Sequence, residues 1–246
     1  MDAQKILNDK SQTWSIFDRK VSKYYDFVSD LISLRLYRRW CTGLANALPK
    51  DKNLHILDLA TGTGIIPLTI HQECKGLEHK YTCVDLSEEM LAVFRDKVKG
   101  KEIESALDIQ YGDATALKHE ENLFDAVTMA CGIRNVGDTQ AGLSEILRVL
   151  KPGGAVYFLE PAIPRSTILK AIFLGYFRHI VPRIAGIFST AEAYKYFNQS
   201  VETFPHSEKF IEMIEAAGFT NCEMRKFTLG SGALYIGFKP EGDSQS

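Results

Sequence analysis

The sequence has few of the features that identify secreted, metal-binding or membrane-spanning proteins. Its five cysteines form no Cys-x-x-Cys pair and its six histidines include no i, i+4 pair, so neither a disulfide framework nor a metal site is indicated. No apolar run reaches the roughly 18 residues of a membrane span. The N-terminus has neither the apolar core of a signal peptide nor the arginine-rich character of a mitochondrial presequence. We therefore expect a cytoplasmic protein that binds no metal.

An excess of positive charge is also missing. Lys and Arg number 29 against 31 Asp and Glu, which gives a formal net charge of -2. This balance provides no basic field for a phosphate backbone, so nucleic acid is not expected as a partner. Hydrophobic residues make up 45% of the 246 residues, which is typical of a globular chain with a buried core.

Short apolar runs alternate with amphipathic stretches through the middle of the chain, which predicts an α/β fold with a doubly wound sheet. We expect strands at residues 54–59, 81–85, 109–111, 124–130, 155–159, 222–228 and 233–238. Helices are expected before residue 49 and at 65–74, 88–99, 140–150 and 207–217. Lys151-Pro152-Gly153-Gly154 should end the helix at 140–150 and turn the chain into the next strand.

The strongest local motif is Asp58-Leu59-Ala60-Thr61-Gly62-Thr63-Gly64, between the first strand and the helix that follows it. Glycines let the backbone turn sharply and approach a ligand, and the helix presents free N–H groups. The sequence matches neither the Gly-x-Gly-x-x-Gly fingerprint nor a Gly-Lys-Ser/Thr phosphate loop, so pyrophosphate binding is disfavoured. By itself the motif fits a nucleotide-like ligand and a plain turn equally well.

Acidic residues follow the next two strands. Asp85-Leu86 ends the second strand, where a carboxylate can accept both hydroxyl protons of a ribose. Asp113-Ala114 follows the third strand, where an acidic side chain can accept from the exocyclic amine of an adenine. These sites share the edge of the sheet at which open α/β folds bind ligands.

Together these motifs resemble those of the class I S-adenosylmethionine-dependent methyltransferases. The resemblance implies that S-adenosylmethionine is the cofactor. It implies a doubly wound, Rossmann-like methyltransferase sheet, mostly parallel with an antiparallel C-terminal strand, plus N-terminal helices and a helical cap. Ala60 stands where many members have the first glycine of the loop. The implied cofactor contacts are Asp58, Thr61, Gly62, Thr63, Gly64, Asp85, Leu86, Asp113 and Ala114.

Further motifs resemble those of the ubiquinone/menaquinone biosynthesis C-methyltransferase family. They are Gly132-Ile133-Arg134-Asn135-Val136-Gly137-Asp138, Glu160-Pro161, Tyr25-Asp26, Tyr194-Lys195-Tyr196-Phe197 and Ser200-Val201 with Phe204-Pro205. The resemblance implies an N-terminal substrate-side segment at 1–48, a methyltransferase domain at 49–240 with a cap at about 163–206, and a disordered tail at 241–246. Tyr25, Tyr37 and Tyr196 are then expected to contact the substrate.

The implied reaction is C-methylation of a lipophilic polyprenyl quinol, demethylmenaquinol or a related benzoquinol. We assign Arg134 to stabilising the phenolate or orienting a water, because its guanidinium cannot ordinarily take a proton, and Asn135 to holding a ring oxygen. Ser29, Arg35 and Tyr37 stand where this family usually has Asn, Gly and His, and Ala130 replaces a Ser seen in some members. Two alternatives stay open: a methyltransferase for another hydrophobic small molecule, and a non-catalytic scaffold.

The segment at 163–188 is apolar and basic, with no acidic residue between Pro161 and Ala191. Its four cations are Arg165, Lys170, Arg178 and Arg183. Such a segment lies either on an anionic membrane surface, at the inner face of the membrane, or as a cap on the sheet. We expect a lid over the acceptor site that touches the membrane, and we keep a homodimer as a further expectation.

Overall fold

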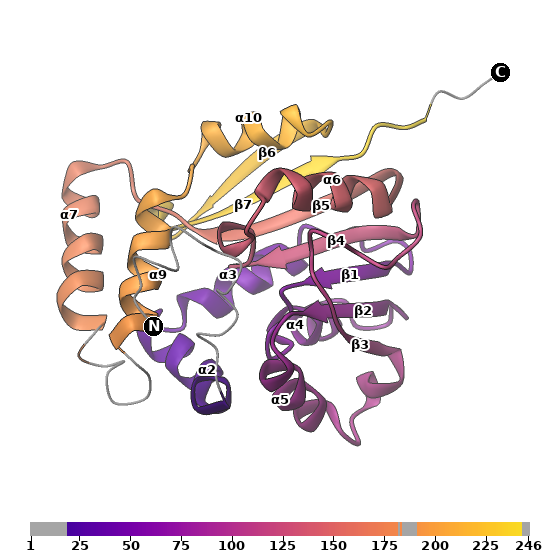
Figure 1. Cartoon of the computed structure of the whole chain (residues 1–246), viewed down its shortest axis with the longest axis horizontal. Coiled ribbons are helices and arrows are strands. Elements are labelled where there is room, and N and C mark those ends of the chain that lie inside the picture. The colour runs from indigo at the N-terminus through magenta and orange to yellow at the C-terminus, as the bar shows by residue number, and fades with distance from the viewer. Residues whose placement is uncertain (1–18, 182, 184–190, 243–246) are drawn as a thin grey trace.

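The computed structural model describes residues 19–181, 183 and 191–242, and among them seven strands form one sheet in the order β3-β2-β1-β4-β5-β7-β6 (Figure 1). The first five strands along the chain pair in parallel, and β7 is antiparallel to both β5 and β6. The predicted sheet is therefore confirmed. The strands are β1 (His55–Leu59), β2 (Lys80–Asp85), β3 (Leu107–Tyr111), β4 (Phe124–Ala130), β5 (Leu150–Pro161), β6 (Thr220–Phe227) and β7 (Gly232–Phe238).

Helices cover both faces of the sheet, as a doubly wound fold requires. One core joins the sheet to α3 (Leu36–Ala45), α4 (Ile65–Glu73) and α5 (Glu88–Val98) through side chains such as Leu44, Ile70 and Phe94. The other core joins it to α6 (Thr139–Val149) and α10 (Glu208–Ala216), whose Ile146 and Phe210 are fully buried. Helix α2 (Arg19–Ile32) lies outside this layer, against α3 and α5.

Strand β5 begins earlier than the sequence predicts. Leu150 already pairs with Phe124, and the next paired residues are Ala155 and Ala126, so the four residues between them form a bulge. A Cβ at Gly154 would lie 2.9 and 3.0 Å from two backbone carbonyl oxygens, which explains why glycine is needed there. As predicted, α6 ends just before Lys151-Pro152-Gly153-Gly154 and the chain enters the next strand there, but these four residues lie within β5 instead of preceding it.

The segment after β5 forms α7 (Thr167–Gly175), a π-helical turn η4 (Tyr176–Ile180) and α9 (Ala191–Thr203). Although α7 is strongly apolar, none of its side chains is buried, and it stands apart from the sheet (Figure 1). Contact with the rest of the molecule comes through η4, where Tyr176 and Phe177 pack on Val28 and Ile32 of α2. Residues 182 and 184–188 of the predicted lid, residues 243–246 of the predicted tail and all of residues 1–18 lie outside the described residues.

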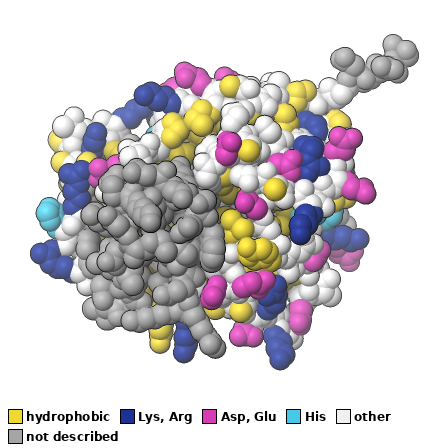
Figure 2. All heavy atoms as spheres, in the orientation of Figure 1, with side chains coloured by type: hydrophobic (Ala, Val, Ile, Leu, Met, Phe, Trp, Pro, Cys, Tyr) yellow, Lys and Arg dark blue, Asp and Glu magenta, His cyan; other side chains and the backbone are white. Residues whose placement is uncertain are grey.

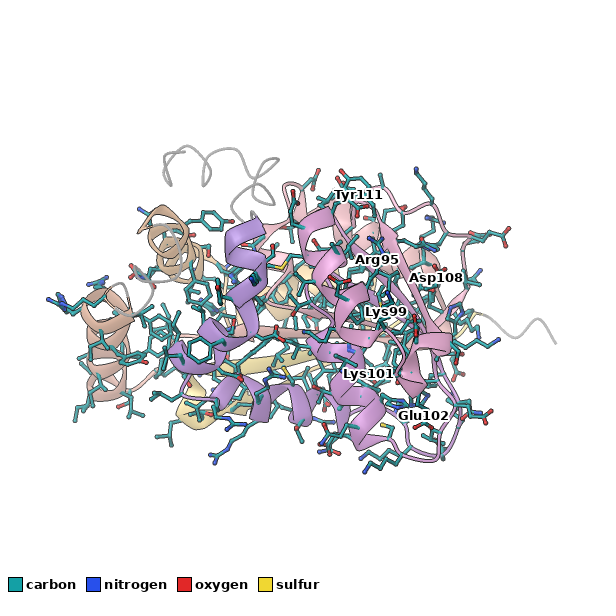
Figure 3. The ribbon with its side chains drawn as sticks, turned by 90° about the horizontal axis from the view of Figure 1, so that it is seen from below. Arg95, Lys99, Lys101, Glu102, Asp108 and Tyr111 are labelled. Carbon is teal, nitrogen blue, oxygen red and sulfur yellow. The ribbon has the colours of Figure 1, made fainter. Side chains whose placement is uncertain are left out.

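Strand β3 is one edge of the sheet, and charged side chains surround it (Figure 3). Arg95 of α5 donates to the carbonyl of Ile109 at 3.3 Å and pairs with Glu88 at 3.0 Å. Further charges come from Lys99, from Lys101 and Glu102 at the start of η2 (Glu102–Ala106), and from Asp108. Charges at an edge strand discourage pairing with a second chain.

Candidate active site

The glycine loop after β1 passes through left-handed backbone conformations at Ala60, Gly62 and Gly64, with φ of 51°, 56° and 78°. A Cβ at Gly64 would lie 2.0 Å from the ring of Phe94, so this glycine lets α4 approach α5. A Cβ at Gly62 would meet nothing within 4 Å. Gly64 is therefore needed for packing, whereas Gly62 borders open space of the kind that a ligand occupies.

Asp58 is buried beneath this loop, with 1% of its surface exposed. Its two oxygens accept hydrogen bonds from the hydroxyls of Thr61 and Thr128, both at 2.6 Å. Burial raises the pKa of Asp58 to about 7, although the two hydroxyl bonds act in the opposite direction. Thr128 was missed in the sequence analysis, and its only signal is a polar residue inside the apolar run of β4.

Asp85, at the end of β2, fastens the glycine loop to the second strand. Oδ2 accepts the backbone N–H of Gly62 at 2.8 Å, and Oδ1 accepts that of Ser87 at 2.9 Å. Burial raises the pKa of Asp85, and these backbone N–H bonds, together with that of Leu86, oppose the rise. Each carboxylate oxygen has a second lone pair, so Asp85 can hold the loop and still accept a ligand hydroxyl.

Asp113 lies beside Asp85 because β3 pairs with β2. The N–H of Gly112 donates to the carbonyl of Asp85 at 3.1 Å, which joins the two strand ends. Oδ1 of Asp113 accepts both the N–H and the hydroxyl of Thr115, at 2.8 and 2.9 Å, and Ala114 packs on the core below. The predicted cofactor contacts thus follow the ends of β1, β2 and β3. Carboxylates for hydroxyl and amino groups, and open space beside Gly62, fit the chemistry of S-adenosylmethionine.

Arg134 follows β4 in the short 3-10 helix η3 (Ile133–Asn135) and is 5% exposed. Its Nη1 donates to Oε2 of Glu160 at 2.6 Å, its Nε donates to Ser200 at 3.4 Å, and its guanidinium lies 5.1 Å from the ring centre of Phe197. Burial acts to lower the pKa of Arg134, but the charge of the fully buried Glu160, the hydrogen bond to it and the effects of Cys131 and Tyr25 together outweigh burial and raise the pKa. Arg134 therefore stays protonated.

Asn135 joins the loop after β4 to the cap helix α9. The hydroxyl of Tyr196 donates to Oδ1 of Asn135 at 2.9 Å, and Nδ2 of Asn135 donates to the carbonyl of Cys131 at 3.0 Å. The structure thus brings a residue assigned to catalysis together with one assigned to the substrate. Asn135 and Tyr196 are 61 positions apart in the sequence.

The other two predicted substrate residues, Tyr25 and Tyr37, come from α2 and α3 and are half-buried. Burial raises the pKa of both, and Cys131 is an electrostatic neighbour of each. The positive charge of Arg134 offsets part of this rise in the pKa of Tyr25. Tyr25, Tyr37, Arg134 and Asn135 therefore gather around Cys131, a residue that the sequence analysis did not select.

The loops after β1 and β4 touch each other. A Cβ at Gly132 would lie 2.8 Å from the Cβ of Ala60, so only a glycine permits this approach. The predicted cofactor loop and the predicted acceptor cluster consequently share a border. Glu160 was named only within a family motif, and its ion pair with Arg134 could not be read from residues 26 positions apart.

The described residues contain neither a cluster of metal ligands nor a membrane-spanning helix. No group of three or more His, Cys, Asp or Glu side chains there could hold a metal ion. Among those same residues, no helix combines the length and the hydrophobicity that crossing a membrane requires.

Comparison with known proteins identifies the relatives of the chain. The sequence model of the ubiE/COQ5 methyltransferase family matches residues 5–239. A ubiquinone/menaquinone biosynthesis C-methyltransferase UbiE of Geobacter sulfurreducens is 38% identical over 233 residues, which cover 95% of this chain and 91% of that protein. A demethylmenaquinone methyltransferase of Chlorobaculum parvum is 36% identical over 244 residues, which cover 96% of this chain and 97% of that protein.

Solved structures with the same fold are more distant in sequence. A putative S-adenosylmethionine-dependent methyltransferase of Methanococcus maripaludis superimposes with a TM-score of 0.67 at 18% identity, covering 93% of this chain and 96% of that one. A possible histamine N-methyltransferase of Thermotoga maritima gives 0.65 at 19% identity, covering 92% and 99%. These likenesses confirm the Rossmann-like methyltransferase fold.

Proposed function

Because the chain belongs to the ubiE/COQ5 methyltransferase family, we propose that it is an S-adenosylmethionine-dependent C-methyltransferase of quinone biosynthesis. Its acceptor is a polyprenyl quinol, demethylmenaquinol or a related benzoquinol. The observation that carries the proposal is the contact of Gly132 with Ala60, which joins the cofactor loop to the loop of Arg134 and Asn135. A cofactor on the first loop and a quinol on the second come within reach of each other.

S-adenosylmethionine supplies a methyl group activated by a sulfonium. The protein has to hold a ring carbon about 3–3.5 Å from that methyl group and keep water away, because a charge-neutralising reaction is fastest in a dry site. Asp85 and Asp113 are assigned to the ribose and the adenine, and Asp58 lies beneath the loop that borders the amino-acid part. Tyr25, Tyr37 and Tyr196 form the acceptor side.

In this mechanism Arg134 acts as a hydrogen-bond donor and not as a base. A ring carbon becomes nucleophilic when the neighbouring hydroxyl loses its proton, and a guanidinium that stays protonated cannot take that proton. Glu160 neutralises much of the charge of Arg134, so the remaining N–H groups, rather than a net positive field, stabilise the phenolate or orient the water that removes the proton. One of the two N–H groups of the Asn135 amide donates a hydrogen bond to the backbone carbonyl of Cys131. We assign the other N–H group to a hydrogen bond with a ring oxygen of the acceptor.

The test separates binding from turnover. We expect Asp85→Ala to weaken the binding of S-adenosylhomocysteine by about 1.5–3 kcal/mol, the scale of a hydrogen bond to a charged group. Asp108→Ala, which removes an exposed carboxylate of the neighbouring strand, should leave binding unchanged and is the matched control. Calorimetry measures both, and equal affinities in the two variants would contradict the assignment of Asp85.

Turnover is measured by mass spectrometry of a methylated quinol. Arg134→Lys should keep the affinity for S-adenosylhomocysteine but lose turnover, because an ammonium does not reproduce the planar guanidinium that contacts Glu160 and Ser200 together. Turnover near that of the wild type would mean that Arg134 only supports the loop. A wild-type protein that binds the cofactor and methylates no quinol would favour the scaffold or another acceptor.

A lipophilic acceptor also requires contact with a membrane, and α7 has the properties for it. Ile168 and Ile172 on this helix are 73% and 64% exposed, and Phe27 and Leu34 near α2 are 56% and 66% exposed. Arg165 and Arg178 pair with Glu208 and Glu202, whereas Lys170 and Arg183 have no acidic partner among the described residues. We assign the exposed face of α7, together with Lys170 on this helix and Arg183 beyond η4, to the surface of an anionic membrane. The homodimer stays a prediction, which light scattering checks.

A further inference from the structure

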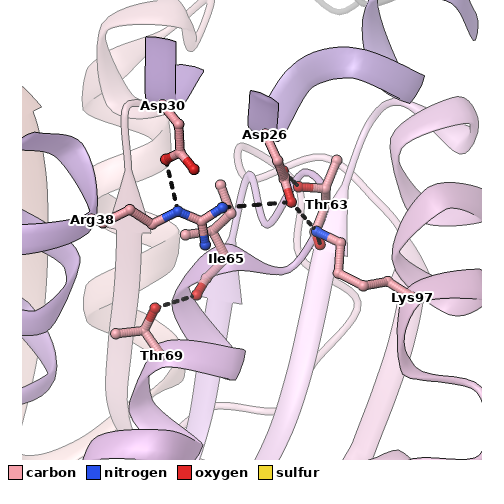
Figure 4. Close-up of polar contacts among 7 residues, drawn as sticks. All are labelled: Asp26, Asp30, Arg38, Thr63, Ile65, Thr69 and Lys97. Carbon is pink, nitrogen blue, oxygen red and sulfur yellow. Dashed lines mark hydrogen bonds and ion pairs between the residues drawn. The ribbon is translucent and has the colours of Figure 1, made fainter. Parts of the chain in front are cut away.

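A polar cluster fastens α2 to the glycine loop (Figure 4). The hydroxyl of Thr63 donates to Oδ1 of Asp26. Lys97 of α5 donates from Nζ to Oδ2 of Asp26 and to the carbonyl of Thr63, both at 2.6 Å. Asp26 and Lys97 are 29% and 23% exposed, so water screens this ion pair less than a surface pair. Thr63 itself is 1% exposed.

The same helix reaches the acceptor side and the cap. Tyr25, next to Asp26, is an electrostatic neighbour of Arg134 and Cys131. One and two turns further on, Val28 and Ile32 pack on Val181. The hydroxyl of Tyr176 donates to the carbonyl of Ile32 at 2.9 Å, which ties the cap to the end of α2. Helix α2 thus contacts the cofactor loop, the acceptor cluster and the cap within two turns.

We propose that Asp26 and Lys97 are positioning residues, which set Tyr25 and the cap in place when a cofactor fixes the glycine loop. Thr63 is the link, because its hydroxyl and its carbonyl are both held by this pair while its backbone belongs to the loop. A ligand that stabilises one conformation of the loop stabilises the contact with α2, and by reciprocity an ordered α2 favours that loop conformation. The inference rests on the proposed function, since it takes the loop to be the cofactor site.

Asp30 provides the matched control. It lies on α2 one turn after Asp26 and accepts from Nε of Arg38 at 2.8 Å. The same Arg38 is only 3.9 Å from Asp26, so both carboxylates share a cationic neighbour. Among the described residues, however, the carboxylate of Asp30 bonds to Arg38 of α3 and to no residue of the glycine loop. Asp30→Asn therefore removes a carboxylate from the same helix without loosening Thr63.

The experiment measures amide hydrogen exchange of residues 19–32 with and without S-adenosylhomocysteine, in the full-length protein. We expect the ligand to slow exchange in the wild type, in Asp30→Asn and in Lys97→Arg, which keeps the charge. The slowing should be lost in Asp26→Asn and Lys97→Met. Using two variants from different helices keeps the test valid if one of them folds poorly.

Steady-state kinetics supply the second readout. In Asp26→Asn and Lys97→Met we expect kcat to fall by about tenfold or more and KM for a water-soluble quinol to rise, as for the loss of a charged hydrogen bond. By the same reciprocity, affinity for S-adenosylhomocysteine should fall in both variants, by up to the factor by which the ligand slows exchange of α2 in the wild type. Equal protection of residues 19–32 in all five proteins, or an equal loss of kcat in Asp30→Asn, would overturn this inference and leave the proposed function standing. A wild type that binds no S-adenosylhomocysteine would overturn the proposed function, and this inference with it.

Discussion

At the scale of single residues, Asp58 links protonation to folding. Its pKa rises from 3.8 to about 7 because the folded chain buries the carboxyl group. Between these two values the folded state holds a proton that the unfolded state has released. The free energy of unfolding therefore decreases as pH rises through this window, and the loss is complete above the folded pKa.

We predict that replacing Asp58 by Asn removes this dependence. The contribution of Asp58 should amount to up to about 4 kcal/mol between pH 4 and pH 7, since each pKa unit corresponds to about 1.4 kcal/mol. Urea unfolding of wild type and variant at several pH values measures it, and the difference between the two curves cancels carboxyl groups with lowered pKa, such as Asp125 and Glu145. Parallel curves would contradict the prediction.

Two residues that stand where many relatives have glycine adopt left-handed backbone conformations. Arg35, between α2 and α3, has a φ of 61°, and Ala60 in the glycine loop has a φ of 51°. Sequence comparison could note both departures but could not tell whether the backbone changes with them. In the structure both positions have a left-handed backbone, which costs a residue with a Cβ roughly 1–2 kcal/mol. The turn is thus imposed by its surroundings and not by the residue that occupies it.

At the scale of elements, the two glycines of the cofactor loop should respond differently to the same substitution. Gly64→Ala places a methyl group inside the ring of Phe94 and should lower the free energy of unfolding by roughly 2–5 kcal/mol, from strain and overpacking together. Gly62→Ala has open space, so strain of about 1–2 kcal/mol is its main cost.

Cofactor affinity, in contrast to stability, should be affected mainly by Gly62→Ala. The methyl group of Gly62→Ala enters the space assigned to the cofactor, so the affinity for S-adenosylhomocysteine should fall in a protein that still folds. Chemical denaturation and calorimetry on the same samples check both expectations. Equal loss of stability in the two variants would mean that Phe94 moves aside, and unchanged affinity in Gly62→Ala would place the cofactor elsewhere.

Local sequence predicts the elements that are determined locally. Strand β4 was predicted at 124–130 and occurs there, because its apolar run is bounded on both sides, and α5 begins at Glu88 behind its Ser87 cap. The start of β5 depends instead on pairing with Phe124, which no pattern near Leu150 reveals. The same holds in the site: glycines and strand-end acids are visible, but the partners of Arg134 and Thr63 come from distant segments.

At the scale of the whole molecule, apolar and basic surface gathers on α7, while the sheet is covered on both faces. Figure 2 shows side chains of both charges interspersed over the right-hand part of this face. Electrostatic attraction to anionic lipid contributes about 1 kcal/mol per cation near the surface and weakens as salt screens it. Because Arg165 and Arg178 are already paired, most of this attraction should come from Lys170 and Arg183.

We predict that changing Arg165, Lys170, Arg178 and Arg183 to Gln reduces sedimentation with anionic liposomes at low salt. A control in which the exposed Lys75, Lys80, Lys99 and Lys101 become Gln has the same net charge and should sediment like the wild type. The double change of Lys170 and Arg183 should reproduce most of the loss. If both fourfold variants sediment equally, only net charge matters and α7 has no special contact with lipid. Methylation of a water-soluble quinol should survive in all of them.

The position of β7 has a consequence for the order in which the protein is made. Although β7 is the last strand along the chain, it lies inside the sheet, between β5 and β6. Strand β5 is completed at Pro161, but its outer edge has no partner until Gly232–Phe238 has left the ribosome. During the intervening synthesis an apolar strand presents unpaired backbone groups, which is the situation in which nascent chains associate wrongly. Closure of the sheet therefore has to wait until the segment that contains β7 has been synthesised.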